Sequence, residues 1–113
     1  MATRKLDHNE IRPYFDRISR TLGTQQVEIE VASLDLGDQI EATWTGLTNI
    51  AYDPKVDTMD VVGPTLDHRI HGPSAVYVQE DESGLHAVEV ERRDGAKEIV
   101  KLSRPLALPA PSA

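Results

Sequence analysis

The segment 26–45 alternates apolar and polar residues in two runs that flank the connection 34–38. Because successive side chains of a strand point to opposite faces, each run would place its apolar residues on one face. The pattern predicts a β-hairpin, and we expect the rest of the chain to pack on its apolar face. The apolar set consists of Val27, Ile29, Val31, Ile40, Ala42 and Trp44.

Short apolar runs recur along the remainder of the chain, and glycine-containing turns separate them. Runs of this length between turn residues are typical of antiparallel strands. We expect a final strand after the last turn, and before it strands at 47–52, 58–62, 75–79 and 85–92.

Charge predicts the register of the last hairpin. A three-residue loop at 94–96 places Arg92 opposite Glu98. A two-residue loop would instead set Glu91 opposite Glu98, and like charges that face each other destabilise a sheet. We therefore expect the three-residue loop.

The segment 6–23 has the pattern of an amphipathic helix, because its apolar residues recur at spacings of three and four. Asp7 and Glu10 have the spacing of a capping box at its start. Pro13 lacks a hydrogen-bond donor, so we expect either a bend or a regular helix that begins closer to Arg12. The apolar stripe consists of Ile11, Tyr14, Phe15, Ile18 and Leu22.

These elements predict an α+β fold. We expect an N-terminal helix packed on a curved, mainly antiparallel sheet of about six or seven short strands, with a half-open barrel as the variant in which the sheet rolls up. A chain of 113 residues has room for one core, so residues 1–108 are predicted to form a single domain. Residues 109–113 are predicted to be a flexible, proline-rich C-terminal tail, and Leu106 and Leu108 are expected to dock the segment before it.

The composition excludes several classes of function. The formal net charge of −7 would repel a phosphate backbone, so nucleic acid is not an expected partner. The absence of cysteine excludes disulfides and thiolate metal sites and fits a reducing compartment. No apolar run reaches the roughly 18 residues of a membrane span. We infer a cytoplasmic protein without a membrane partner, and no motif in the chain requires a cofactor.

The densest polar cluster is the segment 67–71. If it forms a helical turn, His68 and His71 share a face and could hold one divalent ion, with Asp67 or His86 as the third ligand. The alternative is a solvated turn that carries two surface histidines. The spacing lacks the glutamate of the H-E-x-x-H zinc helix.

A second candidate surface is acidic. The polar residues of the predicted strands would share the outer face of the sheet, where carboxylates could meet a basic partner. The alternative is an ordinary solvated face. The residues concerned are Glu28, Glu30, Glu41, Glu89 and Glu91.

Signatures of catalysis are missing from the chain. The serines lack a G-x-S-x-G elbow, and the paired carboxylates fall in predicted turns, where aspartate is common. Three hypotheses of function remain. The first is a non-catalytic interaction or self-association module whose partner is another protein or a second copy, and it leads because strands leave edges open. The others are a small-ligand or divalent-metal-binding domain centred on His68 and His71, and a minor hydrolytic enzyme.

Four segments carry a resemblance to a known family: 26–39, 50–55, 66–68 and 104–109. In them the chain resembles a family of small bacterial proteins that is classed only as a domain of unknown function. The resemblance covers nearly the whole chain and implies a bacterial, single-domain, soluble protein. It implies no reaction, ligand or site residue. Pro13 departs from the unbroken helix that the resemblance implies.

Overall fold

The structure is a computed structural model that describes residues 2–33 and 37–108. These residues form nine strands, one 3-10 turn and one α-helix. The elements in chain order are β1 (Ala2–Lys5), η1 (His8–Glu10), α1 (Ile11–Ser19), β2 (Gln25–Ser33), β3 (Gly37–Leu47), β4 (Asn49–Asp53), β5 (Thr58–Gly63), β6 (Leu66–His71), β7 (Pro73–Asp81), β8 (Gly84–Arg92) and β9 (Lys97–Leu106).

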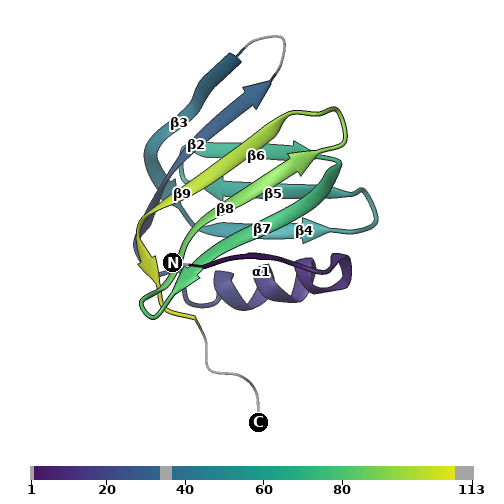
Figure 1. The fold of residues 1–113 in the computed structure, drawn as a ribbon. Coiled ribbons are helices and arrows are strands. Elements are labelled where there is room, and N and C mark those ends of the chain that lie inside the picture. The colour runs from purple at the N-terminus through teal and green to yellow at the C-terminus, as the bar shows by residue number, and fades with distance from the viewer. Residues whose placement is uncertain (1, 34–36, 109–113) are drawn as a thin grey trace.

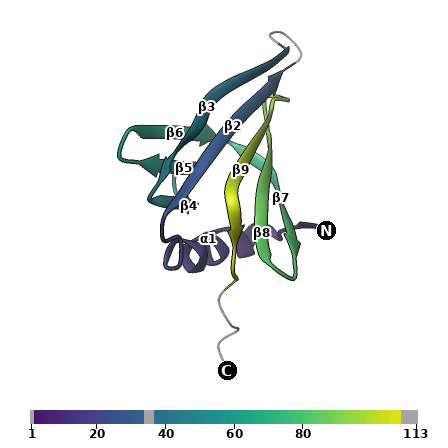
Figure 2. The same cartoon turned by 90° about the vertical axis from the view of Figure 1, so that its left-hand side faces the viewer.

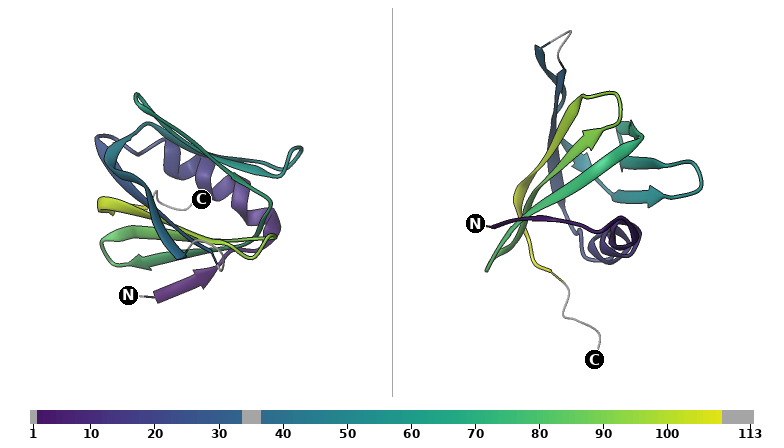
Figure 3. Two further views of the ribbon diagram at one scale, coloured as in Figure 1. Left: turned by 90° about the horizontal axis from the view of Figure 1, so that it is seen from above. Right: turned by 45° about the vertical axis from the view of Figure 1, so that its right-hand side comes forward.

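The strands divide into two antiparallel sheets (Figure 1). The larger has the order β1-β7-β8-β9-β2-β3, and the smaller has the order β4-β5-β6. The sheets face each other across the core, and α1 covers the gap at one end (Figure 3). The predicted combination of a helix with antiparallel sheet is confirmed, but the fold has more strands than expected, and in the described residues no sheet closes into a barrel.

The helix packs as its apolar stripe predicts. Every residue of that stripe is buried, and Phe15 is 0 % exposed. The regular helix begins at Ile11 after the 3-10 turn, so Pro13 falls in the first turn, where no hydrogen bond is lost. This confirms the expected start near Arg12. Ser19 Oγ donates to the Ile50 carbonyl at 2.7 Å and ties α1 to β4.

The β2–β3 hairpin forms as predicted, and Ala42 packs against the core, but the expected burial of Ile40 and Trp44 is wrong. Ile40 is 53 % exposed and Trp44 is 43 % exposed. The cause is a pair of β-bulges, which shift the register on either side of the Ile29–Ala42 pair. Each bulge inserts one residue and reverses the face of the residues beyond it. Trp44 has a positive φ of 37° at one bulge. The strand β3 leans away from the smaller sheet at its free end (Figure 2).

The helical turn considered for 67–71 does not form, because these residues belong to β6. All six residues of β6 pair with β5. Leu66 and Ile70 are four apart, a spacing that fits a strand as well as a helix. Alternation along β6 leaves Ile70 buried and His71 exposed.

The predicted register of the last hairpin is wrong by two residues. The Arg92 amide donates to the Ala96 carbonyl at 2.8 Å, so the three-residue loop begins one residue earlier than expected. Glu98 therefore lies opposite Val90. Gly95 has a φ of 92°, which glycine adopts without strain, and this fixes the turn.

The chain beyond Ser103 continues β9 as far as Leu106. Leu106 pairs with Leu85 and is buried, which confirms its predicted docking. The strand passes so close to Gly84 that a Cβ there would lie 2.0 Å from the Leu106 carbonyl oxygen. Leu108 is 40 % exposed. The predicted flexible tail at 109–113 lies outside the described residues.

Candidate functional site

The predicted metal ligands on β6 do not share a face. His68 and His71 are three apart on a strand, so His68 points inward with Ile70 while Asp67 and His71 are exposed. In residues 2–33 and 37–108, no group of three or more potential metal-ligating side chains comes together. The structure thus places the two histidines apart, and metal binding stays a prediction.

The inward histidine meets a buried carboxylate. His68 Nε2 lies 2.6 Å from Glu98 Oε1, and the Glu98 side chain is 1 % exposed. Arg92 Nη1 donates to Glu98 Oε2 at 3.1 Å, and the same guanidinium pairs with Asp94. Because β6 belongs to one sheet and β8 and β9 to the other, this cluster joins the two sheets. Its contacts use both oxygens of Glu98, one for His68 and the other for Arg92.

The predicted acidic residues lie on the larger sheet, and lysines interrupt them. Glu28 pairs with Lys101 at 3.8 Å, and Glu89 pairs with Lys97 at 3.5 Å. Glu91 lies opposite Lys97 in the register. Within the described part of the chain, Glu30 and Glu41 near the open edge of β3 have no ion pair. Binding of a partner to this face stays a prediction.

The β7–β8 turn brings a serine, a histidine and an aspartate together. Ser83 Oγ donates to Asp81 at 2.5 Å, and His86 Nε2 lies 2.8 Å from the same oxygen and 3.1 Å from Ser83 Oγ. A catalytic triad needs the serine and the acid on different nitrogens of the histidine. Here both contact Nε2, so the three side chains do not form a triad. Their hydrogen bonds lie within the β7–β8 turn. Hydrogen bonds from Ser83 and His86 hold the pKa of Asp81 well below its usual range.

The edge strand β3 is exposed over most of its length. Between Gly37 and Trp44 every residue is exposed except Ala42, which is half-buried. Of the four exposed large apolar side chains in the described residues, two lie on this strand, Ile40 and Trp44. The far end of β3 is covered, because Gly46 packs against Gly63 and Pro64. The open part therefore presents both unpaired backbone groups and apolar side chains.

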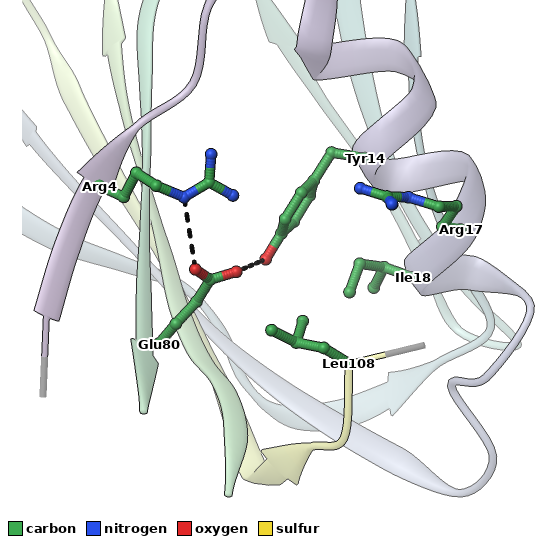
Figure 4. A pocket seen from close by; sticks show the side chains of 6 residues that line it. All are labelled: Arg4, Tyr14, Arg17, Ile18, Glu80 and Leu108. Atoms are coloured by element: carbon green, nitrogen blue, oxygen red, sulfur yellow. Dashed lines mark hydrogen bonds and ion pairs between the residues drawn. The ribbon is translucent and has the colours of Figure 1, made fainter. Parts of the chain in front are cut away.

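A second feature is a pocket of about 160 Å³ between β1, α1, β7 and the chain end (Figure 4). Glu80 is one of its lining residues: Tyr14 donates to it at 2.6 Å, and Arg4 Nε lies 3.5 Å from its other oxygen. Burial and the hydrogen bond to Glu80 raise the pKa of Tyr14 well above its usual value. Arg17 extends toward the same space, above the apolar side chains of Ile18 and Leu108 (Figure 4).

Sequence reasoning misses this pocket. The one signal in the sequence is on the helix, where Tyr14, Arg17 and Ile18 have the spacing of one face. Arg4 and Glu80 come together only because β1 pairs with β7, with Arg4 opposite Val78. The four residues of β1 are all exposed, so no alternation marks them as a strand.

The comparisons with known proteins agree with the resemblance seen in the sequence. The model of a family described as "Family of unknown function (DUF5335)" matches residues 2–111. An uncharacterized protein of Aquifex aeolicus (strain VF5) is 32 % identical over 110 residues, which span 96 % of this chain and 99 % of that protein. No solved structure matches. In residues 2–33 and 37–108, no helix has the length and apolar character that a bilayer crossing needs. The chain therefore belongs to this family of unknown function, DUF5335.

Proposed function

We propose that the protein is a non-catalytic interaction module whose β3 edge receives an extended, basic segment of a partner protein. The observation that carries the proposal is the open stretch of β3, which holds the exposed side chains of Ile40 and Trp44. An edge strand can pair with a further strand through its free backbone groups, while pockets and side chains along it supply specificity.

Charge favours a basic partner over a second copy of this chain. Asp38 and Glu41 lie on β3, and Glu30 lies opposite Ile40 on β2. Within residues 2–33 and 37–108 none of these three carboxylates has an ion pair. A second copy would bring the same carboxylates to the interface, in a molecule whose formal net charge is −7. A strand that alternates apolar and basic residues would neutralise them instead.

The test uses Trp44 as its own reporter, because it is the only tryptophan in the chain. The probe is a short synthetic peptide of alternating valine and lysine, added while Trp44 fluorescence is recorded. We expect a saturable shift to shorter wavelength as the indole loses water. The affinity should fall between about 0.1 M and about 1 M salt, where the Debye length shrinks from roughly 10 Å to roughly 3 Å.

Two matched comparisons identify the mode of binding. Ile40→Lys should weaken binding of the peptide. Val56→Lys adds the same charge at an exposed turn residue away from β3, and this variant should bind the peptide like the wild type. A peptide with a central proline cannot complete the backbone pairing and should not bind. Equal affinity for the proline peptide, or for a peptide of alternating valine and glutamate, would refute the proposal.

Self-association is the competing outcome. Sedimentation of the protein alone would then reveal a dimer that Ile40→Lys disrupts and Val56→Lys does not. That result would show that the β3 edge binds a second copy of this chain, and the proposal of a basic partner would be wrong.

A further inference from the structure

We propose that the pocket between β1, α1 and β7 is a binding site for a small monocarboxylate with a short apolar body, held by Arg17. This site is separate from the β3 edge. Its residues come from four parts of the sequence and surround one space (Figure 4).

In the part of the chain that the structure describes, one cation at the pocket, Arg17, is engaged only by longer-range attraction to Glu10. Glu80 is engaged by Arg4 and Tyr14, and Arg4 also pairs with Glu10 at 3.3 Å. Among the described residues, the Arg17 side chain has no hydrogen bond or ion pair. The guanidinium of Arg17 is directed toward the pocket and not away from it (Figure 4). A carboxylate matches it, since the planar guanidinium binds both oxygens through parallel hydrogen bonds.

Glu80 does not repel such a ligand in the way a free carboxylate would. One of its oxygens accepts the Tyr14 hydroxyl and the other faces Arg4. The raised pKa of Tyr14 keeps that hydroxyl protonated as the donor. Arg4 has N–H groups beyond those directed at Glu80 and Glu10, because a guanidinium carries five. These add a second source of positive potential on the side of the pocket opposite Arg17.

The apolar part of the pocket sets the size of the ligand. Ile18 is buried beneath it, and Leu108 covers it from the chain end. A cavity of roughly 150 Å³ accommodates a molecule the size of benzene. The volume of this pocket, about 160 Å³, is similar. A straight-chain acid of similar size, such as pentanoate, fits with its carboxylate at Arg17 and its alkyl chain against Ile18 and Leu108.

The test is a titration of the full chain with pentanoate, followed by proton–nitrogen correlation NMR that includes the arginine side chains. We expect saturable shifts centred on Arg17 and Glu80, with a dissociation constant on the order of 1 mM. Arg17→Gln should weaken binding by about tenfold or more. Arg20→Gln removes an exposed arginine of the same segment outside the pocket and should bind like the wild type.

Ligand variants separate the two parts of the site. Pentanol keeps the apolar body and inorganic phosphate keeps the charge, and each should bind at least about tenfold more weakly than pentanoate. Leu108→Ser should weaken the binding of pentanoate and leave the small NMR shifts caused by phosphate unchanged. Equal binding by pentanol, or equal affinity in Arg17→Gln and Arg20→Gln, would overturn the site. The peptide titration on Trp44 does not use this pocket, so either proposal can fail alone.

Discussion

Among single residues, Glu98 shows the limit of local sequence patterns, because its two contacts come from different sheets. Alternation along β9 places it on the inner face with Val100, where a carboxylate is costly unless it is paired. The predicted neighbour, Arg92, does contact it, although the register differs by two residues. The second contact, His68, is a candidate metal ligand in the sequence only if its segment forms a helical turn, and it lies on a strand instead. Partners from another sheet cannot be predicted from local spacing.

The buried pair gives a prediction for stability. Glu98→Gln keeps the shape of the side chain but leaves the Arg92 guanidinium without its buried counter-charge and changes the contact with His68. We expect a loss of about 2 to 4 kcal/mol in the free energy of unfolding, since removing one member of a buried pair leaves the other uncompensated. Glu89→Gln, which breaks a surface pair with Lys97, is the control and should cost at most ~1 kcal/mol. Urea unfolding of the three proteins measures both, and similar losses in the two variants would contradict the structural role of Glu98.

At the scale of elements, the predictions succeed where one segment carries its own periodic pattern. The stripe of α1 and the alternation in β2 needed no knowledge of neighbours. The bulges of β3 have no such signature, because Trp44 and Ile40 continue the apolar alternation in the sequence while their backbone reverses it. The strand β1 has no apolar alternation of its own and is a strand through its pairing with β7. The sequence could thus predict β3 as a strand, but neither its place at the edge of the sheet nor its exposed apolar side chains.

The C-terminal part of β9 gives a prediction for one element. A chain that stops after Ser103 loses the buried Leu106 and the Arg104 carbonyl that accepts from Gln25 Nε2 at 3.1 Å. The free energy of unfolding should fall by about 2 to 4 kcal/mol, from the apolar burial and the lost hydrogen bond. A chain that stops after Leu108 keeps these contacts and serves as the control. Thermal unfolding of both chains measures the loss, and equal melting temperatures would show that this end of β9 adds nothing to the core.

For the whole molecule, the sequence predicts the class of fold but not its division into two sheets. Alternation shows which face of a strand is apolar and leaves open which strands pair. The strand β9 joins β8, its neighbour in sequence, to β2, which lies far from it in the chain. The smaller sheet exists because β3 and β4 separate at residue 48 instead of forming one longer strand. The pocket of Arg17 depends on this arrangement, because α1 packs against β4 while its other side faces β1 and β7.

The stability of the whole molecule at alkaline pH follows from two buried tyrosines. Burial, followed by a hydrogen bond to Asp57, raises the pKa of Tyr52 to about 12, and burial with the Glu80 hydrogen bond raises that of Tyr14 further. In the unfolded chain both ionise near pH ~10. Above that pH the unfolded state has released protons that the folded state still holds, so the free energy of unfolding falls as pH rises.

The contribution of Tyr14 can be isolated by comparing variants. Between pH ~10 and ~12, wild type should lose about 1 to 3 kcal/mol more than Tyr14→Phe, which has no proton to release at that position. All other titratable groups are common to the variants and cancel in the comparison. Tyr77→Phe removes a hydroxyl that has no hydrogen bond in the described residues, and it is the matched control. Urea unfolding across this pH range measures the slopes. If Tyr14→Phe loses stability as steeply as the wild type does, burial and the Glu80 hydrogen bond do not hold Tyr14 protonated, and the account of the pocket's charges fails with it.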